Sequence, residues 1–347
     1  MNESSIILKG NNFVKTSMII FFLISMVLTF AVTAIAARIL IPILKSKKMG
    51  QKILDIGPRW HKSKEGTPTM GGLTFVIGMT VTFLTVGIFL IFNGGIESNY
   101  KLIITFIMAL LNSAIGVIDD WTKFSKKQNE GITAKQKMLL QLVVAGLYLF
   151  FMTITDNITT ALYIPFIGFE LELGWFYYVF ALLLITGMIN GVNLIDGIDG
   201  LNSTVTFVVG AYFTVTAFVI GSMQSAVLSA MLIGGCLGFL VYNFYPAKLF
   251  MGDTGSLFLG GIVIGLAFMV DNPLIIVVAG LIYIIENLSS IIQVGYFKLT
   301  HGKRFFKMAP IHHHFEKCGW SELKIVGMFS LFTVVMCVIA YFGIRII

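Results

Sequence analysis

The sequence is poor in charged residues. Asp, Glu, Lys and Arg make up 12% of its 347 residues and 57% are apolar, whereas soluble domains carry roughly 25% charged residues. The apolar residues gather in runs of about 20, the length that crosses a bilayer as a helix. No polar segment is long enough to fold as a separate soluble domain. We therefore predict an all-α integral membrane protein with one polytopic domain over residues 1–347.

Cysteine is also scarce, and the first apolar run does not have the features of a cleavable leader. Cys236, Cys318 and Cys337 have neither the spacing of metal ligands nor that of a disulfide framework. The first apolar run, near residues 17–44, is too long for a signal-peptide core and has no small-residue cleavage site. We therefore expect this run to remain in the protein as its first membrane span.

The apolar runs predict about ten transmembrane helices, and the basic residues orient them. The loops after the odd-numbered spans, together with the span ends that border them, hold 19 of the 24 Lys and Arg residues, and basic loops stay in the cytoplasm. Both termini, including an N-terminal tail over residues 1–16, are then extracytoplasmic. The net charge of +7 thus reports topology and does not call for a nucleic-acid partner. The expected spans are residues 17–44, 69–92, 101–118, 137–155, 175–195, 203–221, 226–243, 255–270, 274–298 and 322–346.

Two segments depart from the pattern of plain spans and short loops. Residues 162–173 alternate apolar and polar side chains around Pro165 and Gly168, which is typical of a small hairpin, here on the outer surface. The span over 274–298 has a polar centre from Glu286 to Gln293. Polar groups at membrane depth indicate a broken or bent helix, or one that faces a groove.

The stretch from Asn190 to Leu201 concentrates unusual residues at the end of a span. It reads N-G-V-N-L-I-D-G-I-D-G-L, with Asp196 and Asp199 among glycines. Carboxylates at a membrane face are costly unless they line a polar site, and glycines let backbone approach a ligand closely. The stretch therefore predicts a polar pocket that holds either a cation or the donor groups of a ligand.

Polar motifs converge on one face of the membrane. Counting spans places every such cluster in an odd-numbered, cytoplasmic loop, and no outer loop carries a comparable one. This common side indicates one active site at the cytoplasmic face. The clusters are residues 64–72, 119–123, 196–199, 242–255 and 310–316.

The acidic motifs each allow two interpretations. Asp119 and Asp120 are suited to cap a helix in the following loop, or, with Asp253 on the same face, to bind Mg²⁺, which takes carboxylate and phosphate oxygens. Asp253 lies in Gly252-Asp-Thr-Gly255. That segment is either an ordinary helix start or a place where backbone N–H groups bind an anion.

Three other features also have an ordinary alternative. His312, His313 and His314 are consecutive, so they cannot easily converge on one metal ion, and no cysteines accompany them; donation to phosphate suits them better. Phe250 is either an interfacial anchor or a ring that stacks on a nucleobase. Lys64 alone is no more than a basic residue of a cytoplasmic loop.

Taken together, the motifs resemble one known family. They are K-x-G-T-P-T-M-G-G from Lys64, D-D-x-x-K from Asp119, N-L-x-D-G-x-D-G-L from Asn193, F-M-G-D-T-G-S-L from Phe250 and P-I-H-H-H-F-E from Pro310. In this order they resemble the polyprenyl-phosphate N-acetylhexosamine-1-phosphate transferase superfamily, and within it the muramoyl-pentapeptide branch. The resemblance covers residues from about 57 to 316.

The resemblance implies a membrane step of cell-wall synthesis. Such enzymes transfer phospho-MurNAc-pentapeptide from UDP-MurNAc-pentapeptide to undecaprenyl phosphate, a membrane lipid, and yield lipid I and UMP. It also implies Mg²⁺ dependence, a multi-pass protein of the bacterial plasma membrane with ten transmembrane helices, and a homodimer. A sister transferase that passes GlcNAc-1-phosphate to the same lipid is the nearest alternative. A cation transporter is a distant one, because transporters place ionisable groups near the bilayer midplane.

The resemblance also assigns roles to individual residues. Asp119, Asp120, Asp253 and His313 match catalytic positions, and Asp253 and Asp120 match the metal site. Phe250 matches the aromatic residue that stacks on uracil. The other positions matched to substrate binding are Lys64, Thr69, Asn193, Asp196, Gly197, Asp199, Asn243, Gln293, His312 and His314.

Overall fold

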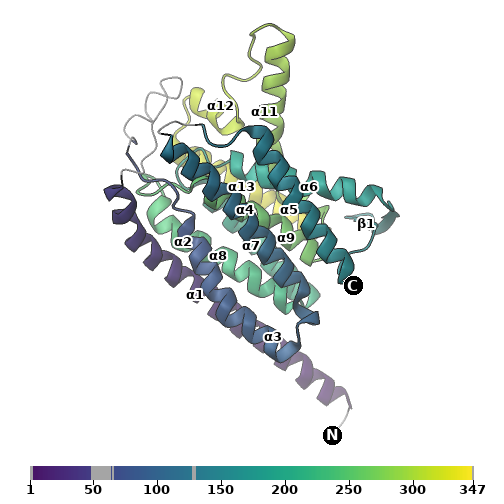
Figure 1. Ribbon diagram of the computed structural model, residues 1–347. Helices are drawn as coiled ribbons and strands as arrows, with labels where there is room; N and C mark the ends of the chain where they lie inside the picture. The colour runs from purple at the N-terminus through teal and green to yellow at the C-terminus, as the bar shows by residue number, and fades with distance from the viewer. Residues whose placement is uncertain (1–2, 48–63, 65, 127–129, 346–347) are drawn as a thin grey trace.

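The chain folds into a bundle of long helices with one small β-hairpin (Figure 1). The structure, a computed structural model, describes residues 3–47, 64, 66–126 and 130–345; most of the first predicted cytoplasmic loop, 48–63, lies outside these residues. The elements are α1 (Glu3–Ser46), α2 (Leu73–Thr82), α3 (Ile88–Gly94), α4 (Tyr100–Ser125), α5 (Ala134–Ile154), β1 (Ala161–Ile164), β2 (Phe169–Glu172), α6 (Phe176–Leu194), α7 (Leu201–Ile220), α8 (Met223–Asn243), α9 (Gly252–Met269), α10 (Ile275–Ala279), α11 (Leu281–Leu299), α12 (Ile311–Lys317) and α13 (Glu322–Tyr341).

Nine helices of the described residues are long and apolar enough to cross a membrane. They correspond to nine of the ten predicted spans. The remaining one, 274–298, is divided at Gly280 into α10 and α11, and α11 carries the polar residues from Glu286 to Gln293. The predicted break is therefore present, but it precedes the polar residues. Figure 1 shows the far end of α11 projecting beyond the other helices.

The first helix is longer than its apolar run. α1 begins at Glu3, so the backbone of the predicted tail, residues 1–16, is helical from that residue onward. A short π-helical segment, Phe83–Gly87, joins α2 to α3, and together they form one candidate span, Leu73–Gly94.

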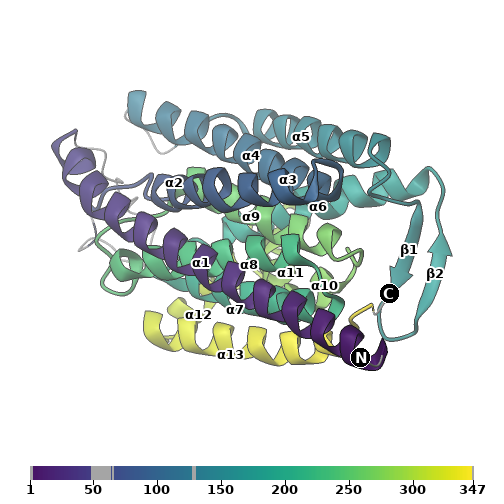
Figure 2. The same ribbon diagram turned by 90° about the horizontal axis from the view of Figure 1, so that it is seen from below.

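The predicted hairpin is present. β1 and β2 pair antiparallel, with Leu162 opposite Leu171. Phe166 and Gly168, in the connecting turn, have φ values of 70° and 69°. Figure 2 shows the hairpin and both chain termini at the same end of the bundle, with α12 at the opposite end. This places the motif-bearing loop around α12 away from the termini.

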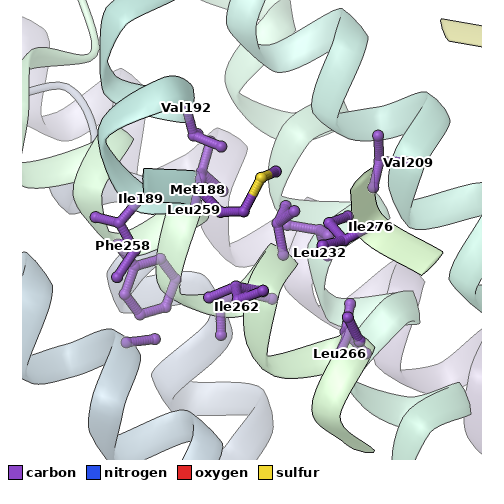
Figure 3. Packing of buried hydrophobic residues seen from close by; sticks show 14 of the residues in the cluster. Met188, Ile189, Val192, Val209, Leu232, Phe258, Leu259, Ile262, Leu266 and Ile276 are labelled. Atoms are coloured by element: carbon purple, nitrogen blue, oxygen red, sulfur yellow. The ribbon is translucent and has the colours of Figure 1, made fainter. Parts of the chain in front are cut away.

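α9 runs through the centre of the bundle, where Thr254 to Met269 are all buried. Its apolar side chains Phe258, Leu259, Ile262 and Leu266 pack among residues of α6, α7, α8 and α10 (Figure 3). Small residues let the neighbouring backbones approach, as is common between membrane helices. At four glycines in and around α9 a Cβ atom would collide with a neighbouring residue: Gly72 with Gly255, Gly116 with the Asp253 carbonyl, Gly260 with Ile189, and Gly261 with Ala109.

Candidate active site

Three carboxylates meet where the end of α4 contacts the start of α9. Asp119 and Asp120 come from α4 and Asp253 from α9, and one oxygen of each lies within 4.8 Å of the others. Asp119 and Asp120 are buried, whereas the Asp253 side chain is 17% exposed. Within the described residues this is the one group of three or more His, Cys, Asp or Glu side chains close enough to share a metal ion.

Two lysines lie against these carboxylates. Lys123 Nζ is 2.6 Å from Asp119 Oδ2, 3.6 Å from Asp120 Oδ1 and 2.8 Å from Asp253 Oδ2. Lys137 Nζ, from the first turn of α5, is 3.0 Å from Asp253 Oδ2. Lys123 follows Asp119 by four residues, so its position on the same helix face was readable from the sequence. Lys137 was not singled out there, because its contact with Asp253 spans 116 residues.

Asp120 caps a helix that is remote from it in sequence. Its carboxylate accepts hydrogen bonds from Asp253 N at 3.2 Å, Thr254 N at 2.9 Å and Thr254 Oγ1 at 2.7 Å. These N–H groups belong to the first turn of α9, where an anion also compensates the helix dipole. The capping interpretation thus applies to Asp120, but on α9. Asp119 instead accepts from Ile132 N at 2.9 Å, just before α5.

Gly252 makes this arrangement sterically possible. It has φ +75°, and a Cβ there would lie 2.7 Å from Asp120 Oδ2 and 3.1 Å from Thr69 Oγ1. Glycine alone adopts that backbone region without strain. Thr69 is therefore close to the same turn that carries Asp253.

The donor set fits a hard divalent cation. Three carboxylates supply closely spaced oxygens, the ligand type that Mg²⁺ prefers, and one of them, Asp253, reaches the surface. The two ammonium groups at the same oxygens show that positive charge is stabilised there. Asp253 and Asp119, whose carboxylates are not used to cap α9, are the most available of the three.

Asn193 belongs to this cluster as well. From the last turn of α6, its Nδ2 donates to Asp253 Oδ1 and to Ser256 Oγ, both at 2.7 Å, while its Oδ1 accepts from Lys137 Nζ at 3.1 Å. The Asn193 amide therefore holds the Asp253 carboxylate through Oδ1, and Oδ2 of the same carboxylate faces the two lysines.

Asp196 lies beside the cluster, in the turn between α6 and α7. Its carboxylate accepts a backbone hydrogen bond from Gly252. Burial raises the pKa of Asp196 well above its ordinary value, and the negative charges of Asp253, Asp120 and Asp199 raise this pKa further. Both effects disfavour the charged form of the Asp196 carboxyl. Among the described residues, Asp196 is not one of the three carboxylates close enough to share a metal ion, and the ligand-binding interpretation of this stretch stays a prediction.

The carboxylates Asp119, Asp120 and Asp253 form one polar corner of the site, and Asp199 occupies a second. Its Oδ1 lies 2.8 Å from Lys64 Nζ and its Oδ2 accepts from Ala247 N at 2.9 Å. Asn243 joins the same loops, since its Oδ1 accepts from Gly200 N at 3.1 Å and its Nδ2 donates to Leu249 O at 2.9 Å. Asp199 and Asn243 thus hold the turn after α6 against the loop after α8.

Phe250 is half-buried on a backbone ladder beside these corners. Its N–H donates to Pro68 O, and its carbonyl accepts from Gly71 N, both at 2.8 Å. Gly72 N continues the pairing to Met251 O at 2.8 Å. The segment from Thr69 to Gly72 is therefore held alongside the residues that lead into Asp253.

The three histidines point to different partners. The buried His312 has Nδ1 3.1 Å from both carboxylate oxygens of Glu286, and its Nε2, without a hydrogen-bond partner among the described residues, faces Gly197. His313 Nδ1 lies 2.5 Å from Glu316 Oε2. His314 Nδ1 accepts from Lys307 N at 3.1 Å. As the sequence argument anticipated, consecutive histidines do not converge on one point.

The structure does not bring every predicted residue to the carboxylates. Gln293 Oε1 accepts from Phe306 N at 2.8 Å, on the loop after α11, and His314 faces the same loop. Three acids outside the predicted set contact predicted residues: Glu286 through His312, Glu316 through His313 and Glu322 through Lys64. Glu286 was visible as a polar residue within a span, whereas nothing in the sequence pointed to Glu322.

Comparison with known proteins defines the class first. Residues 102–271 match glycosyl transferase family 4, a segment that contains all three clustered aspartates. The chain is 44% identical to the phospho-N-acetylmuramoyl-pentapeptide-transferase of Clostridium novyi (strain NT) over 91% of this chain and 95% of the relative. It is 46% identical to that of Clostridium botulinum (strain Alaska E43 / Type E3), over 91% and 94%. The chain belongs to the phospho-N-acetylmuramoyl-pentapeptide-transferase family.

The capping role of Asp120 predicts unequal effects of removing the paired aspartates. Asp120→Ala removes three hydrogen bonds at the start of α9, and Asp119→Ala removes one together with an ion pair to the partly exposed Lys123. We expect the Asp120 variant to lose about 1–2 kcal/mol more stability. Thermal unfolding of both purified variants without divalent cations measures the difference. Equal melting temperatures would contradict the capping role.

Proposed function

We propose that this protein transfers phospho-MurNAc-pentapeptide from UDP-MurNAc-pentapeptide to undecaprenyl phosphate, giving lipid I and UMP. The observation that carries the proposal is the carboxylate–lysine cluster of Asp119, Asp120, Asp253, Lys123 and Lys137 in a chain of this family. The relatives it matches carry the name of that activity over nearly their whole length. The reaction joins two anionic reactants, so neutralising and aligning them is the main task of the site.

We assign Mg²⁺ to Asp253, with Asp120 and Asp119 beside it. When bound, the ion offsets the negative charge of the diphosphate and of the leaving UMP oxygen. Lys123 and Lys137, with their ammonium groups at the same carboxylates, are placed to contact phosphate oxygens. Asn193 keeps Asp253 oriented through its 2.7 Å hydrogen bond.

We assign Asp119 as the general base. It would remove a proton from the lipid phosphate, whose oxygen then bonds to the β-phosphorus while the bond from that phosphorus to the UMP oxygen breaks. A single displacement requires both substrates at the site together, and the lipid headgroup lies at the membrane face where the polar loops gather. The rival route passes through a covalent phosphosugar on a carboxylate.

The remaining polar residues form the binding pocket of this proposal. Asp196, Gly197, Asp199 and Asn243 line the nucleoside side, with Phe250 stacked on the uracil. Lys64 lies beside Asp199, and Thr69 lies in the segment whose backbone is hydrogen-bonded to Phe250 and Met251. His312, His313, His314 and Gln293 extend from the site along α12 and α11, toward the diphosphate or sugar, with His313 in a catalytic role.

The topology of the proposal follows from the basic loops. The cluster lies at the cytoplasmic face and both termini lie outside. The family resemblance adds that the membrane is a bacterial plasma membrane and that the protein is a homodimer. The short motif from Met308 to Glu316 and the names of the relatives favour the muramoyl-pentapeptide substrate over a GlcNAc donor. A cation transporter is disfavoured, because the buried Glu286 is already paired with His312.

Removing the proposed metal ligand predicts a loss of chemistry with retained folding. Asp253→Asn leaves the side-chain shape but removes the charge, so several kcal/mol of charge stabilisation are lost and turnover falls by more than about 100-fold. Mg²⁺-dependent UMP release measures this. Asp156→Asn, at an exposed position beyond α5, is the matched control. Near-normal turnover of Asp253→Asn would exclude the metal role.

Stacking by Phe250 predicts a substrate-selective defect. Phe250→Ala removes the ring, and base stacking is worth about 1–3 kcal/mol, so UDP-MurNAc-pentapeptide should bind roughly 5- to 150-fold more weakly. The KM for undecaprenyl phosphate should not change. Calorimetric titration with the nucleotide sugar gives the affinity, with Phe166→Ala at the hairpin turn as the control. Unchanged nucleotide-sugar affinity of Phe250→Ala would refute the stacking role.

A further inference from the structure

Glu322 opens α13, yet its side chain turns away from solvent. Ser321 caps this helix by accepting from Lys324 N at 3.3 Å, so the helix start is already supplied with a cap. A glutamate in the first turn ordinarily contributes through the helix dipole, facing water. Here the Glu322 side chain is only 9% exposed. Its Oε2 lies 2.6 Å from Lys64 Nζ and 3.4 Å from Asp199 N.

Lys64 is held between two carboxylates as a result. Its Nζ lies 2.8 Å from Asp199 Oδ1 and 2.6 Å from Glu322 Oε2, and 5.8 Å from the centre of the Tyr245 ring. Four separate parts of the chain meet at this ammonium group. They are residue 64, the turn after α6, the loop after α8 and the first turn of α13.

The geometry requires both carboxylates to fix Lys64. A lysine ammonium group sits on a flexible four-carbon stem, so a single partly exposed ion pair holds it weakly. The Lys64 side chain is 15% exposed, while Asp199 is 3% exposed and already accepts Ala247 N. The second, nearly buried carboxylate of Glu322 at 2.6 Å holds the ammonium group in place between Asp199 and Glu322. Glu322 also accepts the Asp199 N–H, so it orders both residues.

We infer that Glu322 is a positioning residue of the nucleotide-sugar pocket. It acts through Lys64 and Asp199 and preorganises them before the substrate arrives, which lowers the entropy that binding must remove. Its contacts are with Lys64 and Asp199 and not with Asp119, Asp120 or Asp253, so we assign it no role in the transfer step. This inference rests on the proposed function, which places Lys64 and Asp199 in that pocket.

Two substitutions separate this role from a general charge at the helix start. Glu322→Gln removes the charge, and Glu322→Asp keeps a carboxylate at the start of α13 but shortens the side chain by one methylene, which draws the carboxylate away from Lys64. Positioning predicts that both raise the KM for UDP-MurNAc-pentapeptide by about 10-fold, the effect of losing a charged hydrogen bond. The kcat and the KM for undecaprenyl phosphate should stay within about twofold. A helix-start role predicts that Glu322→Asp behaves as the unmodified protein.

The measurement is steady-state UMP release by the purified full-length protein, with thermal unfolding of each variant alongside. Asp271→Asn is the control, because Asp271 pairs with Lys101 at 2.6 Å beyond the other end of α9; both KM values should be unchanged. Should Glu322→Gln fail to fold, Glu322→Asp decides alone. An unchanged nucleotide-sugar KM in Glu322→Asp, with normal turnover of the unmodified protein, overturns this inference only. Absence of turnover in the unmodified protein overturns the proposed function, and this inference with it.

Discussion

The hydrogen bonds from the start of α9 to Asp120 are the contact on which the site depends. They fix Thr254 and the backbone of Asp253 against the end of α4, at a place where Gly116 lets the two backbones meet. A helix N-terminus carries unpaired N–H groups and a partial positive charge. One carboxylate of the cluster therefore serves the fold, and by doing so it presents another, Asp253, to the surface.

Charge divides the polar face into two corners. Around Asp253, three carboxylates face two lysines, an excess of negative charge that suits a divalent cation and then phosphate. Around Lys64, two carboxylates face one lysine. The turn with Asp196, whose pKa is raised by burial and by Asp253, lies between them. In the function that we propose, a nucleotide sugar spans both corners, with its diphosphate at the first and its nucleoside at the second.

The sequence predicted those features that are local or that depend on hydropathy. Spans, the hairpin around Pro165 and Gly168, and the interruption of the ninth span all follow from periodicity and turn residues. Counting the spans assigned all the polar motifs to odd-numbered loops, and therefore to one face of the membrane. The ninth span differs in detail, because Gly280 breaks the helix ahead of the polar residues that signalled the break.

Contacts between remote residues could not be predicted in this way. The pairs Lys137 with Asp253, Asp120 with Thr254, and Lys64 with Glu322 join residues more than a hundred positions apart, and no spacing rule connects them. The length of α1 was missed for another reason. Its first turns are polar, so they are absent from an apolar run although their backbone is helical from Glu3.

The central claim is that one site at the membrane face joins a nucleotide-activated muramoyl peptide to a lipid phosphate. It is tested by incubating the purified protein with UDP-MurNAc-pentapeptide, undecaprenyl phosphate and Mg²⁺, and by quantifying UMP and lipid I in parallel with a reaction that contains UDP-GlcNAc. The account predicts stoichiometric UMP and lipid I from the muramoyl donor and no product from UDP-GlcNAc. Turnover of UDP-GlcNAc in place of UDP-MurNAc-pentapeptide would contradict it.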